Sequence, residues 1–272
     1  MKEITFGLNR IISPDLNLDG FFSMASALGI RYVELRNDIR NGQIFDGLDP
    51  SDVKAKCRDH GLTIFSINAL QQFNKKGPLD EKIREVRDLL ASAKNYGCKA
   101  LVMCPVNDPA DTRSKEESFE DTVTALKAYG PYFKESGVLG LVEPLGFSIC
   151  SLRTKEKAVK AINQAGGTET YKLVHDTFHH FLSGETVIFP KETGLVHISG
   201  VEETIEKEEI NDSHRVLVGS YDRMFNIGQI RKLIEGGYEG VFSYEPFGSQ
   251  IQKLSIGRLK EELEKSIRSI TD

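Results

Sequence analysis

Eight short apolar segments alternate with longer amphipathic segments along this 272-residue chain, and that alternation constrains its fold more than any other feature. The apolar segments lack the regular polar alternation of a strand with one wet face, and they are typical of parallel strands buried on both faces. We therefore expect strands at Ile4–Leu8, Tyr32–Leu35, Leu62–Ile67, Ala100–Met103, Val138–Val142, Tyr171–Val174, Leu195–Ile198 and Val241–Tyr244.

The amphipathic segments between these strands carry helix signals. Apolar residues recur at helical spacing in the segment Asp80–Tyr96, which stops at Gly97. Another segment has Pro50 in its first turn and ends at Gly61, and glycine suits the left-handed backbone found just after many helices. We expect helices at Leu18–Leu28, Asp49–His60, Asp80–Tyr96, Glu116–Glu135, Thr154–Gln164, Ile227–Glu235 and Ile251–Ile270.

Strands that alternate with helices form either an open doubly wound sheet or a closed barrel. An open sheet that binds nucleotides needs a glycine-rich phosphate loop after its first strand, but the segment Asn9–Pro14 contains no glycine. The pattern therefore favours the α/β class and a (β/α)₈ TIM barrel. At 272 residues the chain has the usual size of one such barrel, so we expect a single domain over residues 1–272.

Composition excludes several classes of function. The net charge of −5 and the pI near 5.8 disfavour nucleic acid as a partner, because proteins that bind phosphate backbones carry clustered Lys and Arg. The chain lacks a run of about 18 apolar residues, which a membrane span requires. Residues 1–7 lead into strand-like sequence without the apolar region of a signal peptide, and the four cysteines are scattered. We therefore expect a cytoplasmic protein with reduced thiols.

Side chains that can bind metal stand at the ends of four consecutive predicted strands. Glu143 and Glu245 each begin the same phrase, Glu-Pro followed by an apolar residue and Gly, while Asp176 and His197 end the two strands between them. In (β/α)₈ barrels the active site lies at the carboxyl ends of the strands. We therefore expect these four side chains, which we call the tetrad, to converge.

A divalent metal ion is the physical explanation that we favour for the tetrad. Clustered carboxylates in a partly dehydrated site repel one another unless a cation offsets their charge. Three oxygen donors and one imidazole suit Mn²⁺, Mg²⁺ or Co²⁺, and Zn²⁺ also accepts His and carboxylate ligands. A single Glu at a strand end is more often a helix cap or an ion-pair partner, but four such residues at consecutive strand ends are hard to attribute to chance. We expect one metal ion, bound by Glu143, Asp176, His197 and Glu245.

Other polar residues near the strand ends have less specific interpretations. Asn68 and Glu34 either orient substrate hydroxyls or make local hydrogen bonds. His175 directly precedes the tetrad's aspartate, and because strand residues alternate between faces, we expect its side chain to point away from the site. We interpret His180 and His214 as surface or loop residues.

At these motifs the chain resembles a known family. Its Glu-Pro-Leu-Gly, Asp-Thr-Phe-His, Val-His-Ile and Tyr-Glu-Pro phrases resemble those of the xylose isomerase-like TIM barrels, and within them the sugar phosphate isomerase/epimerase group. That group includes inosose isomerases and dehydratases, ketose 3-epimerases and hydroxypyruvate isomerases. The resemblance covers essentially the whole chain, and it is more specific for the fold and the metal site than for the substrate.

The resemblance implies roles for individual residues. The tetrad matches the family's metal ligands, and Glu143 and Glu245 also match the pair that exchanges protons with substrate in ketose epimerases. His179 and Arg215 match residues that contact substrate. Several epimerases carry another Glu shortly after the first ligand, but this chain has Phe147–Cys150 there, which disfavours a strict ketose 3-epimerase.

The expected function is that of a divalent-metal-dependent isomerase or epimerase acting on a small sugar, keto-sugar or cyclitol. Proton abstraction next to a carbonyl would give a metal-stabilised enediolate, with Glu143 and Glu245 as the proton-transfer groups. His179, Arg215 and Asn68 would contact the substrate.

Other functions and assembly states remain open at this stage. An inosose-type dehydratase and a non-catalytic barrel that binds metal and sugar use the same residues. An endonuclease on the same fold would need more metal-binding His than the six in this chain, and a basic groove. Barrels of this type often pair through their outer helices, so a homo-oligomer is one option.

Overall fold

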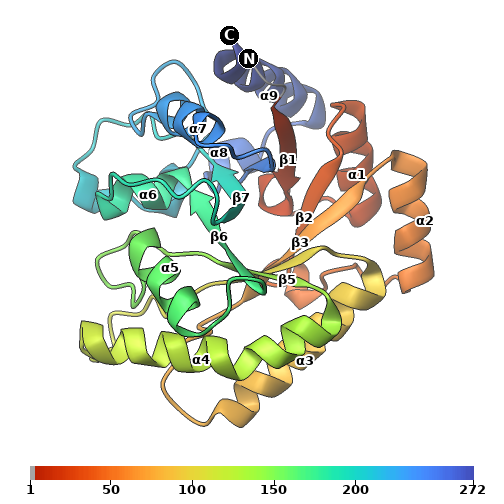
Figure 1. Cartoon of the computed structure of the whole chain (residues 1–272). Coiled ribbons are helices and arrows are strands. Elements are labelled where there is room, and N and C mark those ends of the chain that lie inside the picture. Colours follow the sequence, from red (N-terminus) through yellow and green to blue (C-terminus); the bar gives the residue numbers. More distant parts are fainter. Residues whose placement is uncertain (1–3) are drawn as a thin grey trace.

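Eight parallel strands close into a barrel in the computed structural model, which describes residues 4–272 (Figure 1). Each strand pairs with the next one in sequence, and β1 pairs with β8 to complete the ring. This arrangement confirms the predicted (β/α)₈ barrel. Residues 1–3, part of the stretch in which we expect no signal peptide, lie outside the described residues. The strands are β1 (Thr5–Asn9), β2 (Tyr32–Arg36), β3 (Thr63–Leu70), β4 (Ala100–Met103), β5 (Leu139–Val142), β6 (Tyr171–Asp176), β7 (Thr193–Ile198) and β8 (Val241–Tyr244).

Helices follow the strands and surround the barrel (Figure 1). They are α1 (Leu18–Ala27), α2 (Pro50–His60), α3 (Leu79–Tyr96), α4 (Lys115–Ser136), α5 (Lys155–Gln164), α6 (Thr177–Ser183), α7 (Asn226–Glu235), α8 (Ser249–Gln252) and α9 (Ile256–Thr271). The predicted helices agree with α1 to α5 and with α7 to within one residue at each end. Within residues 4–272, no helix is both long and apolar enough to cross a membrane.

The sequence prediction is wrong at two places in the helical layer. The predicted closing helix Ile251–Ile270 is two helices, α8 and α9, because Ser255 between them has extended backbone and its side chain caps the start of α9. The helix α6 was not predicted, since a helix of seven residues is too short to show a helical period. Its first turn depends instead on Asp176, whose carboxylate accepts the amide hydrogens of Phe178 and His179.

Alternation along each strand decides which side chains reach the barrel interior. One cluster made only of strand residues packs inside the ring: Ala69, Ala100, Val102, Leu141, Val174, Leu195 and Val241. Glu143, Asp176 and His197 each follow a member of this cluster by two residues, and Glu245 follows one by four. The tetrad residues therefore lie on the inner face of their four strands, just beyond the apolar interior of the barrel.

Candidate metal centre

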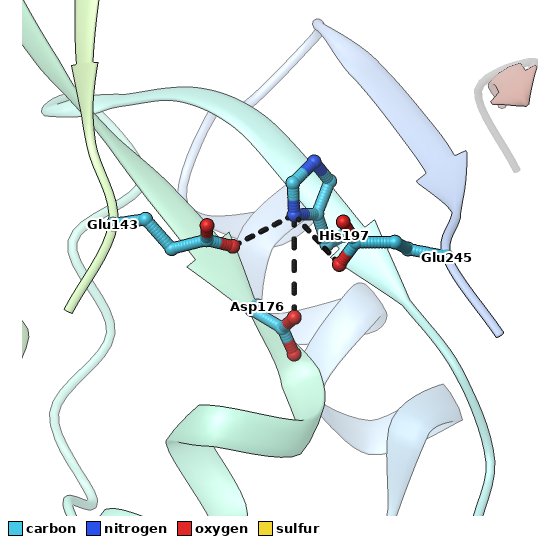
Figure 2. Close-up of side chains that lie close together, drawn as sticks. All are labelled: Glu143, Asp176, His197 and Glu245. Atoms are coloured by element: carbon cyan, nitrogen blue, oxygen red, sulfur yellow. Dashed lines mark hydrogen bonds and ion pairs between the residues drawn. The ribbon is translucent and has the colours of Figure 1, made fainter. Parts of the chain in front are cut away.

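The tetrad converges at the carboxyl end of the barrel. Figure 2 shows its four side chains pointing toward one another, and one ligand atom from each lies within 4.8 Å of those of the other three. They stand at the ends of β5, β6, β7 and β8, so the convergence predicted from the sequence is confirmed. Each of these residues is at most 4% exposed, which leaves the carboxylates largely shielded from water.

His197 lies at the centre of this group. Its Nδ1 atom is 2.8 Å from Glu143 Oε1, 3.2 Å from Glu245 Oε2 and 4.0 Å from Asp176 Oδ2 (Figure 2). Burial lowers the pKa of His197, but Glu245, Glu34 and Glu143 outweigh burial and raise that pKa well above its ordinary value. The neighbouring carboxylates therefore favour the protonated form of this imidazole, and a bound cation would take over that role.

The tetrad fits a divalent ion by both charge and size. Donors about 2.1 Å from one ion stand at most about 4.2 Å apart, so a set that lies within 4.8 Å needs to contract by only about 0.6 Å. Three carboxylates and one imidazole also match the oxygen and nitrogen ligands that Mn²⁺, Mg²⁺, Co²⁺ and Zn²⁺ take in proteins. The residues can therefore hold such an ion.

Two arginines approach the tetrad, Arg36 from the end of β2 and Arg215 from the loop after β7. Arg215 Nη2 donates to Asp176 Oδ2 at 2.7 Å and to Glu245 Oε2 at 3.0 Å, while Arg36 Nη1 donates to Glu245 Oε1 at 2.8 Å. Burial would raise the pKa of Glu245, but His197 and the two arginines hold that pKa well below its usual range. Glu245 is therefore ionised in the structure. The sequence analysis identified Arg215 but missed Arg36. The one feature that could have pointed to Arg36 is its position at the end of a predicted strand.

Aromatic rings cover the two guanidinium groups. The ring of Phe247 lies 5.0 Å from the guanidinium carbon of Arg36 and 4.8 Å from that of Arg215. The Phe178 ring lies 4.7 Å from the guanidinium carbon of Arg215. Both arginines are buried beneath these rings, at 5% and 1% exposure.

The other two predicted substrate-binding residues have different surroundings. His179, in the first turn of α6, is 5% exposed, and its Nδ1 atom has no hydrogen-bond partner within residues 4–272. Its ring centroid lies 5.2 Å from that of Phe147 and 5.1 Å from that of Phe178, and these two phenyl rings also contact each other. Asn68 Nδ2 donates to Glu34 Oε2 at 2.9 Å, so this amide makes a local hydrogen bond. Contact of either residue with substrate stays a prediction.

Three further histidines, on β6, α6 and the loop after β7, lie outside the tetrad. His175 points outward, as predicted, and its Nε2 atom is 2.9 Å from Gln229 Oε1 on α7. The interpretation of His180 as a surface or loop residue is wrong, because it is buried with Nδ1 2.8 Å from Lys155 Nζ. Burial and two lysines lower the pKa of His180 to about 3. His214 lies in a short surface turn, as expected.

Comparison with known proteins identifies the family. The family model described as xylose isomerase-like TIM barrel matches residues 22–272. A xylose isomerase domain containing protein from Salmonella typhimurium is 35% identical, with 98% of this chain and 97% of that chain covered and a TM-score of 0.91. No match was found among curated proteins.

Two more distant structures share the fold. The IolI protein, solved with a zinc atom, is 22% identical, with 98% of both chains covered and a TM-score of 0.89. The D-psicose 3-epimerase from Clostridium cellulolyticum, solved with D-tagatose, is 17% identical, with 98% of both chains covered and a TM-score of 0.77. With the family match over residues 22–272 and the barrel itself, these findings show that the chain belongs to the xylose isomerase-like TIM barrel family.

Proposed function

We propose that this protein is a divalent-metal-dependent isomerase or epimerase, which acts on a small sugar, keto-sugar or cyclitol by moving a proton next to a carbonyl group. One observation carries the proposal: the buried carboxylates of Glu143 and Glu245 face a common centre, 2.8 and 3.2 Å from the same His197 nitrogen. The zinc in IolI and the D-tagatose in the psicose epimerase structure support the metal and the substrate class.

The tetrad would hold the metal ion. When bound, the ion acts as a Lewis acid that polarises a substrate carbonyl, which acidifies the neighbouring C–H bond. Arg36 and Arg215 remain beside the tetrad and keep Glu245 ionised, so that this carboxylate is available both as a ligand and as a proton acceptor.

Two carboxylates on different strands allow a proton to leave and return by different routes. Glu143 ends β5 and Glu245 ends β8, so one can remove the proton while the other returns it, which gives an epimer. Return of the proton to the neighbouring carbon gives an aldose–ketose isomer. The negative charge that develops on the substrate oxygens would be stabilised by Arg215 and by an N–H group of His179, whose Nδ1 atom has no hydrogen-bond partner within residues 4–272.

Metal analysis and proton exchange together test this proposal. Elemental analysis of the purified protein should find about one ion per chain. Proton NMR in D₂O with Mg²⁺ or Zn²⁺ should then show loss of one substrate C–H signal from a ketose, an inosose or hydroxypyruvate. Lack of metal binding, or metal binding without exchange on any of these compounds, would contradict the proposal.

Substitution of one glutamate assigns the exchange to the tetrad. We expect Glu245→Gln to slow exchange by roughly 10²–10⁴-fold, because the amide cannot accept the proton. The matched control is Glu261→Gln, a substitution on α9 where the side chain is 61% exposed, and it should exchange at the normal rate. Near-normal exchange by the Glu245 variant would remove that residue from the mechanism.

A further inference from the structure

We infer that Glu34 is a positioning residue for His197, which accepts the hydrogen on Nε2 and so directs the lone pair of Nδ1 toward the metal ion. The inference rests on the proposed metal centre, and it adds to that centre a residue from β2, on a different strand from every member of the tetrad.

The two nitrogens of His197 face different partners. Nδ1 points into the tetrad, whereas Nε2 lies 3.2 Å from each carboxylate oxygen of Glu34. The His197 ring is fully buried and Glu34 is only 1% exposed, so water cannot replace this contact. A neutral imidazole has one N–H donor and one acceptor nitrogen, and a donor at Nε2 therefore leaves Nδ1 as the acceptor.

The surroundings of Glu34 hold its carboxylate as an acceptor. Ser66 Oγ donates to Glu34 Oε2 at 2.5 Å, and Asn68 Nδ2 donates to the same oxygen at 2.9 Å. Asn68 Nδ2 also donates to Ser66 Oγ at 3.2 Å, which orients the hydroxyl toward the carboxylate. Both donors come from the inner face of β3 and aim the Glu34 carboxylate at His197.

This arrangement has a known chemical consequence at metal centres. A histidine ligand commonly donates its second N–H to a carboxylate, which selects the tautomer, orients the ring and strengthens the ligand. Loss of such a partner typically lowers metal affinity by about 10–100-fold. This explains the hydrogen bond made by Asn68. It fixes the carboxylate of Glu34, which in turn fixes the ring of His197.

Zinc affinity of matched variants tests the inference. Calorimetric titration of the metal-free protein with Zn²⁺ should show binding weakened by roughly 10–100-fold in Glu34→Gln, and further in Glu34→Leu, which has no acceptor. The control is Glu185→Gln, at a glutamate whose side chain is only 6% exposed and pairs with Lys155 at 3.1 Å outside the metal centre. It should lower the stability of the fold without changing zinc affinity. Thermal unfolding of each metal-free variant confirms that the titrated protein is folded.

A second readout reports the tautomer directly. Nitrogen-15 NMR of the zinc-loaded wild-type protein should show His197 protonated on Nε2 and not on Nδ1. Protonation of Nδ1, or equal zinc affinity of the folded Glu34 variants and the wild-type protein, would overturn the inference while the metal centre itself stands. Absence of zinc binding by the wild-type protein would instead refute the proposed function.

Discussion

Arg215 Nη2 donates to Oδ2 of Asp176 at 2.7 Å, and this bond ties the loop after β7 to the end of β6. The same nitrogen reaches Glu245 Oε2 at 3.0 Å, and Nε donates to Ser199 Oγ at 3.0 Å. Because these partners share one planar guanidinium, Arg215 helps to set both the position of the loop and the orientation of two tetrad carboxylates.

Replacement of that side chain by lysine should impair the proposed reaction. An ammonium group lacks the planar fork of arginine and cannot serve the same partners together. A hydrogen bond to a charged group contributes about 1.5–3 kcal/mol, so Arg215→Lys should slow solvent-proton exchange by about 10- to 100-fold. The control is Arg258→Lys on α9, where the side chain is 54% exposed. Equal exchange rates in the two variants would contradict the role of Arg215.

Asp46 holds the loop after β2 against the start of α1, and its removal should destabilise the fold. Its carboxylate accepts from Arg10 at 2.8 Å, from Arg40 at 2.8 Å and from the Leu18 amide at 2.6 Å. The Arg10 side chain is fully buried, so Asp46→Ala leaves a buried guanidinium without its carboxylate. The expected loss is about 3–5 kcal/mol in the free energy of unfolding, measured by urea denaturation.

The matched control for Asp46 is an aspartate of a surface ion pair. Asp19 pairs with Lys56 on the outside of the barrel, where its side chain is 56% exposed. Exposed ion pairs contribute little to stability, so Asp19→Ala should leave the urea midpoint nearly unchanged. A small effect of Asp46→Ala in the same assay would show that Arg10 finds another partner.

Gly140 on β5 lies against the ring of Tyr171 on β6, and alanine should not fit there. A Cβ atom at position 140 would stand 2.4 Å from Cδ1 of Tyr171. That ring is held by a hydrogen bond from its hydroxyl to the Leu126 carbonyl at 2.9 Å, so it cannot easily move aside. We expect Gly140→Ala to lower the free energy of unfolding by about 1–3 kcal/mol, which is measured as a lower midpoint of thermal unfolding.

A second glycine provides the opposite expectation in the same measurement. Gly228 lies inside α7, and a Cβ atom added there would meet nothing within 4 Å. Since alanine favours the helix over glycine by about 0.5–1 kcal/mol, Gly228→Ala should raise the unfolding midpoint. Similar midpoints for the two variants would refute the steric argument at Gly140.

Buried, uncharged His180 should make the protein sensitive to acid. Lys155, Lys232, Glu185 and His175 surround its ring, and its pKa is lowered to about 3 in the folded protein. In the unfolded chain the pKa is near the ordinary 6.5, so the unfolded state binds the proton first as the pH falls. The stability contributed by neutral His180 is therefore complete above pH 6.5 and is lost toward pH 3.

Urea denaturation at two pH values measures this effect. Between pH 8 and pH 5 the free energy of unfolding should fall by about 2 kcal/mol more in the wild-type protein than in His180→Asn. The amide oxygen of the asparagine can still accept a hydrogen bond from Lys155, but the side chain does not titrate. Identical losses in both proteins would show that His180 does not carry the acid sensitivity.

Local sequence patterns were sufficient for the barrel and for most of its elements. Apolar runs locate the strands because burial on both faces leaves no polar position, and glycines such as Gly61 and Gly97 mark helix ends because both adopt left-handed backbone there. Local patterns failed at α6 and at the break between α8 and α9, where single side chains, Asp176 and Ser255, begin helices by capping them.

The sequence by itself also determined which residue types meet in the tetrad, since parallel strands in a barrel bring their carboxyl ends to one rim. Only the tertiary structure decided how that group is surrounded. Arg36 pairs with Glu245 across 209 residues of chain, and Glu34 meets His197 across 163. Such contacts depend on the stagger and tilt of the strands in the closed sheet and on the side-chain rotamers inside it. The spacing of residues within one strand carries no information about the strand geometry or the rotamers.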